Sequence, residues 1–180
     1  AYYGQPLRVA IEPNYVRSAE GGAGYAKAAG NYGAALYPAR KMQERGYHQL
    51  IWTDAREHKY IEESGTMNVM FVIDGKLITP AVSTTILSGI TRDSVLQIAR
   101  DKGIPVEERK VAVSEIVEAH KAGKLKEAFG TGTAATIAQI ATIHCNGEGL
   151  VLPALEGREI SNAIAAELDR IKNRQAPGLH

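Results

Sequence analysis

The sequence predicts a single α/β domain in which a mixed β-sheet is curled into a partial barrel and flanked by helices. Three observations predict this class: strand-like segments are more numerous than a doubly wound fold would show, several are joined by tight turns, and others are separated by segments with helical periodicity. The chain has 180 residues and 44% hydrophobic residues, which suits one globular domain with its own core. No internal repeat or linker divides it.

The first third of the chain predicts two strands separated by a loop and a helix. Residues 7–11 form an apolar, β-branched segment that Pro13-Asn14 closes, so we expect a strand there. A glycine-rich loop follows over residues 20–30. Apolar residues then recur at helical spacing from Tyr32 to Met42, with Asn31 as the expected N-cap and Gly46 as the stop. Residues 48–53 have strand composition.

The middle of the chain predicts an antiparallel meander followed by a helix. Strands are expected at residues 60–61 and 67–73, with a break at Ser64-Gly65. Asp74-Gly75 is the strongest hairpin signal in the chain and leads into the strand that begins at Lys76. A helix should start at Thr91 as its N-cap and end near Gly103, so that free N–H groups at its start make a phosphate site.

The last third predicts two further helices and three strands. A strand is expected at 106–111, an amphipathic helix at 113–122, and a strand at 125–129 that leads into a turn at 130–133. A strand of small residues should follow at 138–144. Apolar residues at Ile160, Ile164 and Leu168 then predict a final amphipathic helix, with basic residues near its end.

Composition argues against several classes of function. The chain has 21 basic and 20 acidic residues, which leaves no strong field for nucleic acid or an anionic membrane. Charged residues interrupt every apolar run well before the roughly 20 residues that a membrane span needs. Cys145 is the only cysteine and is compatible with a reducing cytosol or a matrix-like compartment, and we expect a cytoplasmic protein. The five histidines lack the spacing of metal ligands, so we expect no metal site.

The segment GGAGYAKAAGNYG, residues 21–33, carries the first candidate for chemistry. Lys27 lies there among glycines and small residues, with few charges beside it in the sequence. A lysine that is poorly solvated offers a free amine as a nucleophile toward an aldehyde cofactor. Ala28 follows Lys27, so the segment lacks the Gly-Lys-Ser/Thr end of a nucleotide P-loop, and it is also a poor dinucleotide fingerprint. Taken alone, such a segment is more often a plain surface turn.

Four motifs occur in one order along the chain and resemble those of the branched-chain amino acid aminotransferases. They are GYAKAAGNYG around Lys27, EESGTMN with Glu63, LSGITR from Leu87 to Arg92, and FGTGTA from Phe129 to Ala134. The resemblance covers nearly the whole chain. It implies a fold-type-IV pyridoxal 5'-phosphate enzyme with the large-domain fold of D-amino acid aminotransferase. It also implies that residues 1–180 are the larger, C-terminal, cofactor-binding domain, and that a smaller N-terminal domain precedes them in the whole enzyme.

The resemblance assigns a role to each motif. Lys27 is the catalytic lysine, Glu63 rather than Glu62 holds the proton of the pyridine nitrogen, and Tyr32 hydrogen-bonds the phenolic oxygen of the cofactor. Leu87 presses on the ring, the amides of Ile90 and Thr91 and the hydroxyl of Thr133 bind the phosphate, and the amides of Thr133 and Ala134 bind the substrate carboxylate. The full cofactor-binding set is Lys27, Tyr32, Glu63, Thr66, Leu87, Gly89, Ile90, Thr91 and Thr133.

The implied activity is the transfer of the amino group of leucine, isoleucine or valine to 2-oxoglutarate, as in branched-chain amino acid biosynthesis, by a homodimer when the protein is full length. A D-amino acid aminotransferase or an aminodeoxychorismate lyase of the same fold is the alternative enzyme. Their acid motif usually continues E-G-x-x-x-N, whereas this chain has E-S-G-T-M-N from Glu63. A non-catalytic fragment is the other alternative, because the family's active site also uses the preceding domain and the partner subunit. Many animal members of the family carry a C-x-x-C pair where this chain has Ala135 and Ala138, so thiol regulation at that site is not expected.

Overall fold

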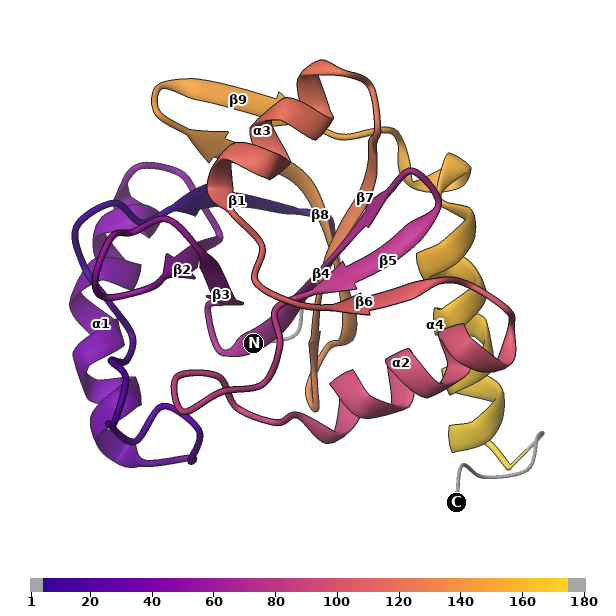
Figure 1. The fold of residues 1–180 in the computed structure, drawn as a ribbon, viewed down its shortest axis with the longest axis horizontal. Coiled ribbons are helices and arrows are strands. Elements are labelled where there is room, and N and C mark those ends of the chain that lie inside the picture. Colours follow the sequence, from indigo (N-terminus) through magenta and orange to yellow (C-terminus); the bar gives the residue numbers. More distant parts are fainter. Residues whose placement is uncertain (1–4, 175–180) are drawn as a thin grey trace.

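A computed structural model describes residues 5–174 and shows six strands closed into a barrel (Figure 1). The strands follow one another in the order β3-β2-β1-β8-β7-β4, and a further pairing of β3 with β4 closes the ring. The sheet is mixed as predicted, but the barrel is closed rather than partial. Its strands are β1 (Leu7–Ile11), β2 (Gln49–Thr53), β3 (Ile61–Ser64), β4 (Met67–Ile73), β7 (Leu125–Gly132) and β8 (Thr136–Cys145).

Three shorter strands extend the sheet beyond the barrel. Strands β5 (Lys76–Thr79) and β6 (Val106–Glu108) continue outward from β4, and β9 (Glu148–Val151) pairs with β8. Strand β1 runs parallel to β2 and β8, and β5 runs parallel to β6, whereas the other pairs are antiparallel. The meander predicted in the middle of the chain is therefore present as β3-β4-β5.

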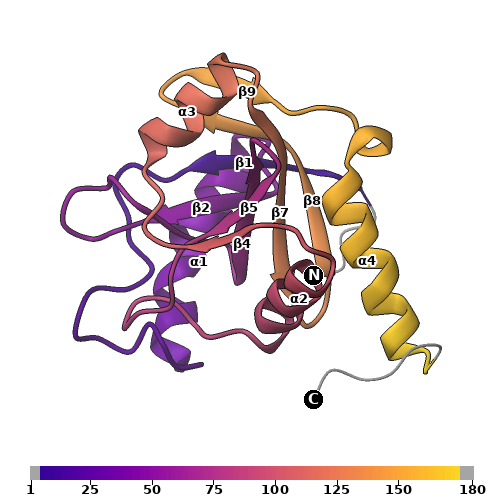
Figure 2. The same ribbon diagram turned by 45° about the vertical axis from the view of Figure 1, so that its right-hand side comes forward.

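Four α-helices cover the barrel (Figures 1 and 2). Helix α1 (Ala29–Glu44) lies over β1 and β2, where Met42 packs with Leu50 and Trp52. Helices α2 (Ile90–Asp101) and α4 (Glu159–Lys172) pack on the side of β4 and β7, and α3 (Val113–Lys121) lies near one end of the barrel. A 3-10 turn (Leu155–Gly157) precedes α4.

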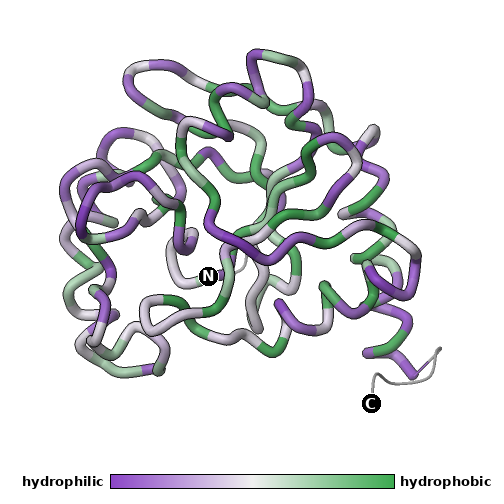
Figure 3. The backbone as a smooth tube through the Cα atoms, viewed as in Figure 1, coloured by the Kyte–Doolittle hydropathy of each residue, from purple (hydrophilic) through white to green (hydrophobic). Residues whose placement is uncertain are grey.

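The barrel interior is filled by alternate side chains of its strands. Val9, Ile51, Val69 and Ile140 belong to one buried cluster that also includes Ile116 from α3. On β4, Met70 and Val72 face the other way, toward α2 and α4. Every residue of β4 is therefore buried. This explains why the strand is an apolar run from Val69 to Ile73 instead of an alternating sequence. In Figure 3 the hydrophobic residues accordingly follow the strands, and hydrophilic residues dominate the loops.

Several predicted chain reversals are confirmed at glycines with positive φ. Asp74 and Gly75 have φ of 50° and 75°, as the two-residue hairpin between β4 and β5 requires. Gly46 and Gly103 have φ of 89° and 73° and follow the ends of α1 and α2. At these positions glycine takes the left-handed conformation without a steric cost.

Both predicted N-caps are wrong. Helix α1 begins after Ala28, and Asn31 lies inside it, where its side-chain amide donates to the carbonyls of Ala23 and Ala26. Helix α2 begins after Gly89, so Thr91 is its second residue. In each case the side chain that was expected to cap the helix lies within its first turn, and a residue in an extended conformation precedes the helix.

The predicted ends of three strands also need correction. The turn expected at 130–133 is instead at 133–135, because β7 continues through Gly132 and pairs there with Thr136 of β8. The strand predicted at 106–111 is shorter, and the one at 138–144 is longer and pairs with β9, which was not predicted. Pairing with neighbouring strands decides where each strand begins and ends, and local composition does not encode that pairing.

Arg158 ties α4 to the barrel. Its side chain is 1% exposed and donates hydrogen bonds to the carbonyls of Ala128, Ile140 and Pro153 and to the side-chain oxygen of Gln139. Its guanidinium thus satisfies carbonyls of both β7 and β8. Because a buried charge is tolerated only when it is well paired, loss of any member of this network should destabilise the fold.

Candidate active site

An irregularity in β3 places two neighbouring glutamates on the same flank of the barrel. Thr53 of β2 lies opposite Ile61, but Ile51 lies opposite Ser64, so β3 has one extra residue between these pairs. Such a bulge breaks the alternation of side chains along a strand. Glu62 and Glu63 both contact the loop at 83–87 instead of pointing to opposite faces.

Glu63 is held at both carboxylate oxygens. The backbone N–H of Leu87 donates to Oε1 at 2.8 Å, and Nε of Arg17 lies 3.2 Å from Oε2. The residue is only 3% exposed. Burial raises the pKa of the Glu63 carboxyl to about 7, because the attraction of Arg17 and the Leu87 N–H only partly offsets the loss of solvation, while Glu62 raises it further.

Glu62 is also buried, but its partner is different. The hydroxyl of Thr85 donates to its Oε1 at 2.7 Å, and Oε2 has no hydrogen-bond partner among the described residues. Burial raises the pKa of the Glu62 carboxyl, against the opposing effects of Thr85 and Arg17. The two adjacent acids are therefore distinguished by their environment: only Glu63 has the guanidinium and a backbone N–H directly at its carboxylate.

The glycine-rich loop at residues 20–30, which contains Lys27 and is called the lysine loop below, docks closely on the 83–87 loop. A Cβ added to Gly24 would lie 2.6 Å from the side chain of Ser18 and 2.8 Å from the Cα of Thr85. The N–H of Tyr25 donates to the carbonyl of Thr84 at 3.1 Å. Glycine at position 24 therefore allows a backbone approach that a side chain would block.

Lys27 itself is exposed and has no hydrogen-bond or ion-pair partner within residues 5–174. The poorly solvated setting inferred from the sequence is thus not present in this chain alone. The loop is nevertheless fixed on both sides of the lysine, by Gly24 on one side and by Asn31 on the other. Tyr32 lies half-buried in the first turn of α1, five residues after Lys27.

The start of α2 lies next to Glu63. Gly89 is the N-cap, and Leu87, two residues earlier, is the residue whose N–H binds Glu63. The side-chain amide of Asn68 donates to the carbonyl of Leu87, and a Cβ on Gly89 would lie 2.3 Å from the Asn68 oxygen. The N–H groups of Ile90 and Thr91, in the first turn, have no partner within the helix. Free N–H groups at a helix start are suited to an anion, and these lie beside the buried acid.

The β7–β8 hairpin borders the same region. Thr131 pairs with Asn68, and its buried hydroxyl has no hydrogen-bond partner among the described residues. Figures 1 and 2 both show the tip of the hairpin beside the start of α2. Thr133 and Ala134 are exposed at this tip. A Cβ added to Gly130 would lie 2.8 Å from the side chain of Met67. The glycine therefore makes room for packing within a strand rather than for a turn.

The structure therefore brings Glu63, Leu87 and Gly89 of the predicted site together. Hydrogen bonds connect Glu63 to Leu87 and Leu87 to Asn68, and Asn68 also lies close to Gly89 and pairs with Thr131 of the hairpin. Thr66 is exposed in the tight turn between β3 and β4, and no polar contact links it to the other site residues within the described chain.

Sequence reasoning missed three residues that hold this region together, namely Arg17, Asn68 and Thr85. A signal existed for Asn68, which ends the motif EESGTMN and is the polar residue at the start of an otherwise apolar strand. Arg17 is one arginine in a loop, and no spacing rule relates it to an acid 46 residues later. Only the folded chain shows that they are partners.

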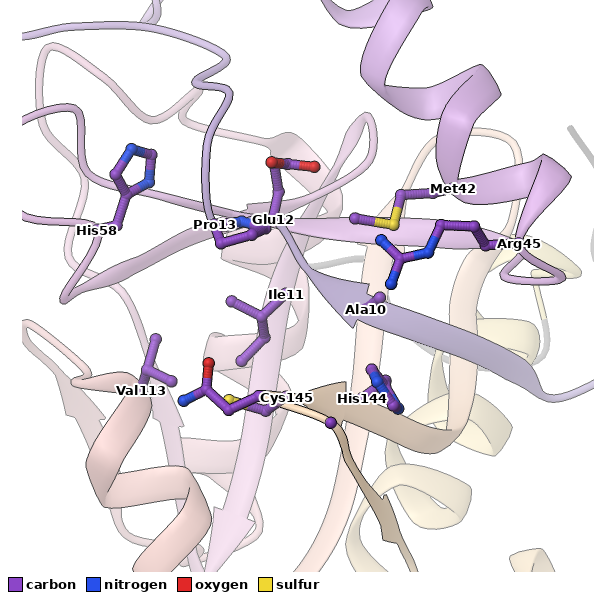
Figure 4. Close-up of a pocket in the computed structure, with 12 residues that line it drawn as sticks. Ala10, Ile11, Glu12, Pro13, Met42, Arg45, His58, Val113, His144 and Cys145 are labelled. Atoms are coloured by element: carbon purple, nitrogen blue, oxygen red, sulfur yellow. The ribbon is translucent and has the colours of Figure 1, made fainter.

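A separate cavity of about 370 Å³ lies at the other end of the barrel, where β1 and β8 finish (Figure 4). Glu12, Arg45, His58 and His144 contribute polar groups to its lining. Oε1 of Glu12 already accepts hydrogen bonds from the N–H groups of Asn14 and Tyr15. Its lining includes none of the predicted site residues, so we do not assign it to the candidate active site.

Residues 5–174 contain no group of three or more His, Cys, Asp or Glu side chains suited to a metal ion. None of the helices in the same range is long and apolar enough to cross a membrane.

Comparison with known proteins gives consistent matches. Residues 1–143 match the family described as amino-transferase class IV. The chain is 46% identical over 156 residues to branched-chain-amino-acid transaminase 1 of Bacillus subtilis, covering 84% of this chain and 44% of that protein. It is 42% identical over 177 residues to a probable branched-chain-amino-acid aminotransferase of Staphylococcus aureus, covering 96% and 49%.

A solved structure gives the same match at the level of the fold. The branched-chain aminotransferase of Thermoproteus uzoniensis, determined with norvaline, superposes with a TM-score of 0.80 at 32% identity, over 94% of this chain and 52% of that one. The chain thus spans about half the length of the relatives it matches.

The residues present fit a phosphorylated aldehyde cofactor with a basic ring nitrogen. Free amides at the start of α2 suit a phosphate, the buried Glu63 suits a protonated ring nitrogen, and the unpartnered Thr131 hydroxyl lies beside them. Gly24 and Gly89 are positions where a side chain would collide with the surrounding loops. The arrangement can therefore hold an anion at one end and a cationic ring nitrogen at the other.

Proposed function

Because the chain belongs to the amino-transferase class IV family, we propose that it is the C-terminal, pyridoxal 5'-phosphate-binding domain, residues 1–180, of a branched-chain amino acid aminotransferase. One observation carries this proposal most strongly. The buried carboxylate of Glu63 is fixed by the N–H of Leu87 only two residues before the N-cap of α2, so an acid for a ring nitrogen and an anion site for a phosphate lie side by side.

The proposed roles follow from these positions. Glu63 keeps the proton on the pyridine nitrogen, and the amides of Ile90 and Thr91 bind the phosphate with the positive end of the α2 dipole. The Thr133 hydroxyl adds a phosphate donor, Leu87 lies along the ring, and Tyr32 hydrogen-bonds the phenolic oxygen. Pyridoxal phosphate, when bound, supplies an electron sink for the bonds at the substrate α-carbon.

Lys27 has two tasks in this proposal. Its Nζ would hold the cofactor by its aldehyde, and as a free amine Nζ would take up and return the proton of the substrate α-carbon. The amides of Thr133 and Ala134 orient the substrate by its carboxylate. The fixed lysine loop supports this role, since a base must be held within hydrogen-bond reach of the proton it moves.

The exposure of Lys27 indicates that further groups are needed to exclude water from the site. We propose that these come from an N-terminal domain outside this chain and from a second subunit of a homodimer. The relatives that this chain matches are about twice as long as the chain, which supports the proposal of a further domain. Exclusion of water would weaken the solvation of the lysine ammonium and favour the reactive free amine.

The proposed substrates are leucine, isoleucine and valine, with 2-oxoglutarate as the acceptor. The names of the relatives support the branched-chain donor class. We place the enzyme in the cytoplasm, where the free, buried Cys145 would remain reduced, and expect neither nucleic acid nor membrane as a partner.

The test of cofactor binding uses the 180-residue chain with added pyridoxal phosphate. We expect visible absorbance above that of the free cofactor, and borohydride reduction should fix the cofactor on the peptide that contains Lys27. Lys27→Ala should lose both signals. Lys121→Ala, which changes an exposed lysine on α3, is the matched control and should keep them. Attachment at another lysine would contradict the assignment of Lys27.

The test of substrate class uses the full-length protein. Turnover of L-leucine with 2-oxoglutarate, compared with D-alanine, separates the branched-chain assignment from a D-amino acid aminotransferase, and formation of 4-aminobenzoate and pyruvate from aminodeoxychorismate would identify the lyase. We expect the isolated 180-residue chain to turn over L-leucine far more slowly than the full-length protein. Equal turnover per subunit would show that no further domain is needed. A chain that folds but stays colourless would be a non-catalytic fragment.

A further inference from the structure

Arg17 is a buried guanidinium that joins three segments of the candidate site. Its side chain is 6% exposed, and Nη2 donates to the carbonyls of Gly24 and Thr85 at 2.7 and 2.6 Å. Its Nε lies 3.2 Å from Oε2 of Glu63. One side chain thus contacts the lysine loop, the 83–87 loop and the acid on β3.

Both protons of Nη2 have carbonyl acceptors, which leaves the charge of Arg17 directed at Glu63. The Nε atom has no hydrogen bond with acceptable geometry among the described residues, so its contact with Glu63 is electrostatic. A guanidinium in this place has a fixed plane, because two carbonyls from different loops hold one end of it. The position of Glu63 relative to the lysine loop is therefore set through Arg17.

We propose that Arg17 is a positioning residue that favours the ionised form of the Glu63 carboxylate and holds it in register with the Lys27 loop. This inference rests on the proposed function for its catalytic meaning, although the link between Arg17 and Glu63 can be measured without the cofactor. A neutral carboxyl at position 63 would be unable to hold a protonated ring nitrogen by charge. Arg17 is thus required for the acid to work, although Arg17 itself need not touch the cofactor.

The other groups around Glu63 cannot replace Arg17. On β3 the neighbour is Glu62, a like charge that opposes ionisation, and on the loop before α2 it is the neutral N–H of Leu87. Asn68, the residue of β4 that pairs with Glu63, is neutral. Glu62 in turn feels the negative charges of Asp54 and Glu20. Arg17 is the cation that acts on this acidic group from the elements packed around it.

The decisive experiment follows the titration of the Glu63 carboxyl by NMR in the chain labelled with ¹³C at the glutamate side-chain carboxyls. The Glu63 signal is assigned by its absence from Glu63→Gln. In Arg17→Met we expect its midpoint to move upward by at least about one pH unit, since a single opposite charge within 4–6 Å shifts a carboxyl by about 1–3 units. Arg17→Lys retains the charge and should restore most of the shift.

Arg40→Met serves as a control, because it removes an exposed arginine that is paired with Glu44 on α1, and it should leave the Glu63 midpoint unchanged. An unchanged midpoint in Arg17→Met would overturn the proposal. If Arg17→Met does not fold, Arg17→Lys decides the matter: a midpoint close to that of the parent chain supports a role through charge, and a midpoint raised by a unit or more refutes it.

Cofactor affinity across pH then tests the functional meaning. In Arg17→Met, affinity for pyridoxal phosphate should fall at least tenfold near pH 7 and recover toward the parent value near pH 9, where Glu63 ionises again. A loss that is equal at all pH values would indicate a purely structural role and would refute the proposal. In the Glu63→Gln background, Arg17→Met should no longer alter the pH profile.

Failure of the proposed function has a different signature from failure of this inference. If the parent chain shows no cofactor absorbance at any pH while the Glu63 midpoint still depends on Arg17, the cofactor assignment fails for this chain and the Arg17–Glu63 link stands. If absorbance appears and the midpoint does not respond to Arg17, the inference fails and the proposed function stands.

Discussion

Glu63 should make the folded chain less stable as pH rises, and Glu63→Gln should remove that loss. The carboxyl has an ordinary value of 4.5 and is raised to about 7 in the folded state, mainly because it is buried. The folded chain therefore binds a proton more tightly than the unfolded chain between these two values. By linkage, its contribution to stability is complete below about pH 4.5 and is lost as pH rises through about 7.

The size of the effect follows from the shift. The difference of about 2.5 units between the two pKa values, at about 1.4 kcal/mol per unit, gives a loss of about 3 kcal/mol between pH 4.5 and pH 8. Such a loss is a substantial fraction of the 5–15 kcal/mol that typically stabilises a domain. It would represent a cost of keeping an acid buried where the chemistry needs it.

The assay is urea unfolding of the parent chain and of Glu63→Gln at several pH values from 4.5 to 8. Glu63→Gln also leaves Arg17 without its counter-charge, but that cost should be similar at every pH in this range and cancels when slopes are compared. The free energy of unfolding of the parent should fall by about 3 kcal/mol relative to Glu63→Gln across the range.

Glu118→Gln changes an exposed glutamate on α3 and should follow the parent chain at each pH. Parallel curves for the parent and Glu63→Gln would refute the reasoning, because they would mean that the Glu63 carboxyl titrates alike in the folded and unfolded states.

Three further substitutions test the packing around the site. Gly24→Ala should weaken cofactor binding at least tenfold, because its methyl group would collide with Ser18 and Thr85; Gly30→Ala, which meets nothing within 4 Å, is the control in the same segment, and equal affinities would contradict the close-docking argument. Arg158→Met should lower the free energy of unfolding by about 3 kcal/mol or more, because the carbonyls of Ala128, Ile140 and Pro153 and the side-chain oxygen of Gln139 lose their donor. A change below about 1 kcal/mol would show that water replaces the guanidinium as the donor. Thr136→Gly should raise the unfolding free energy by about 1 kcal/mol, because Thr136 has a φ of 53°, and a loss measured in the same assay would mean that contacts of the threonine outweigh the strain.

The motifs indicate part of the candidate site from the sequence because they join residues that lie close together along the chain. Gly89, Ile90 and Thr91 are contiguous, so a helix that starts anywhere in LSGITR presents their amides together. The N-cap was nevertheless misassigned, since the choice between Gly89 and Thr91 depends on Asn68, which contacts the loop from another strand. Threonine and glycine are about equally favourable as caps, so local propensity does not decide between them and tertiary contacts do.

The sequence by itself determined the class of the fold, the hairpin at Asp74-Gly75 and the order of the motifs, because these depend on periodicity, turn chemistry and residues close in the chain. Only the tertiary structure decided that the barrel closes through β3 and β4, and that a bulge turns Glu62 and Glu63 to the same flank. Likewise, it decided that Arg17 is the partner of Glu63. Closure, bulges and ion pairs between distant residues depend on the register of strands far apart in the sequence, and local pattern does not fix that register.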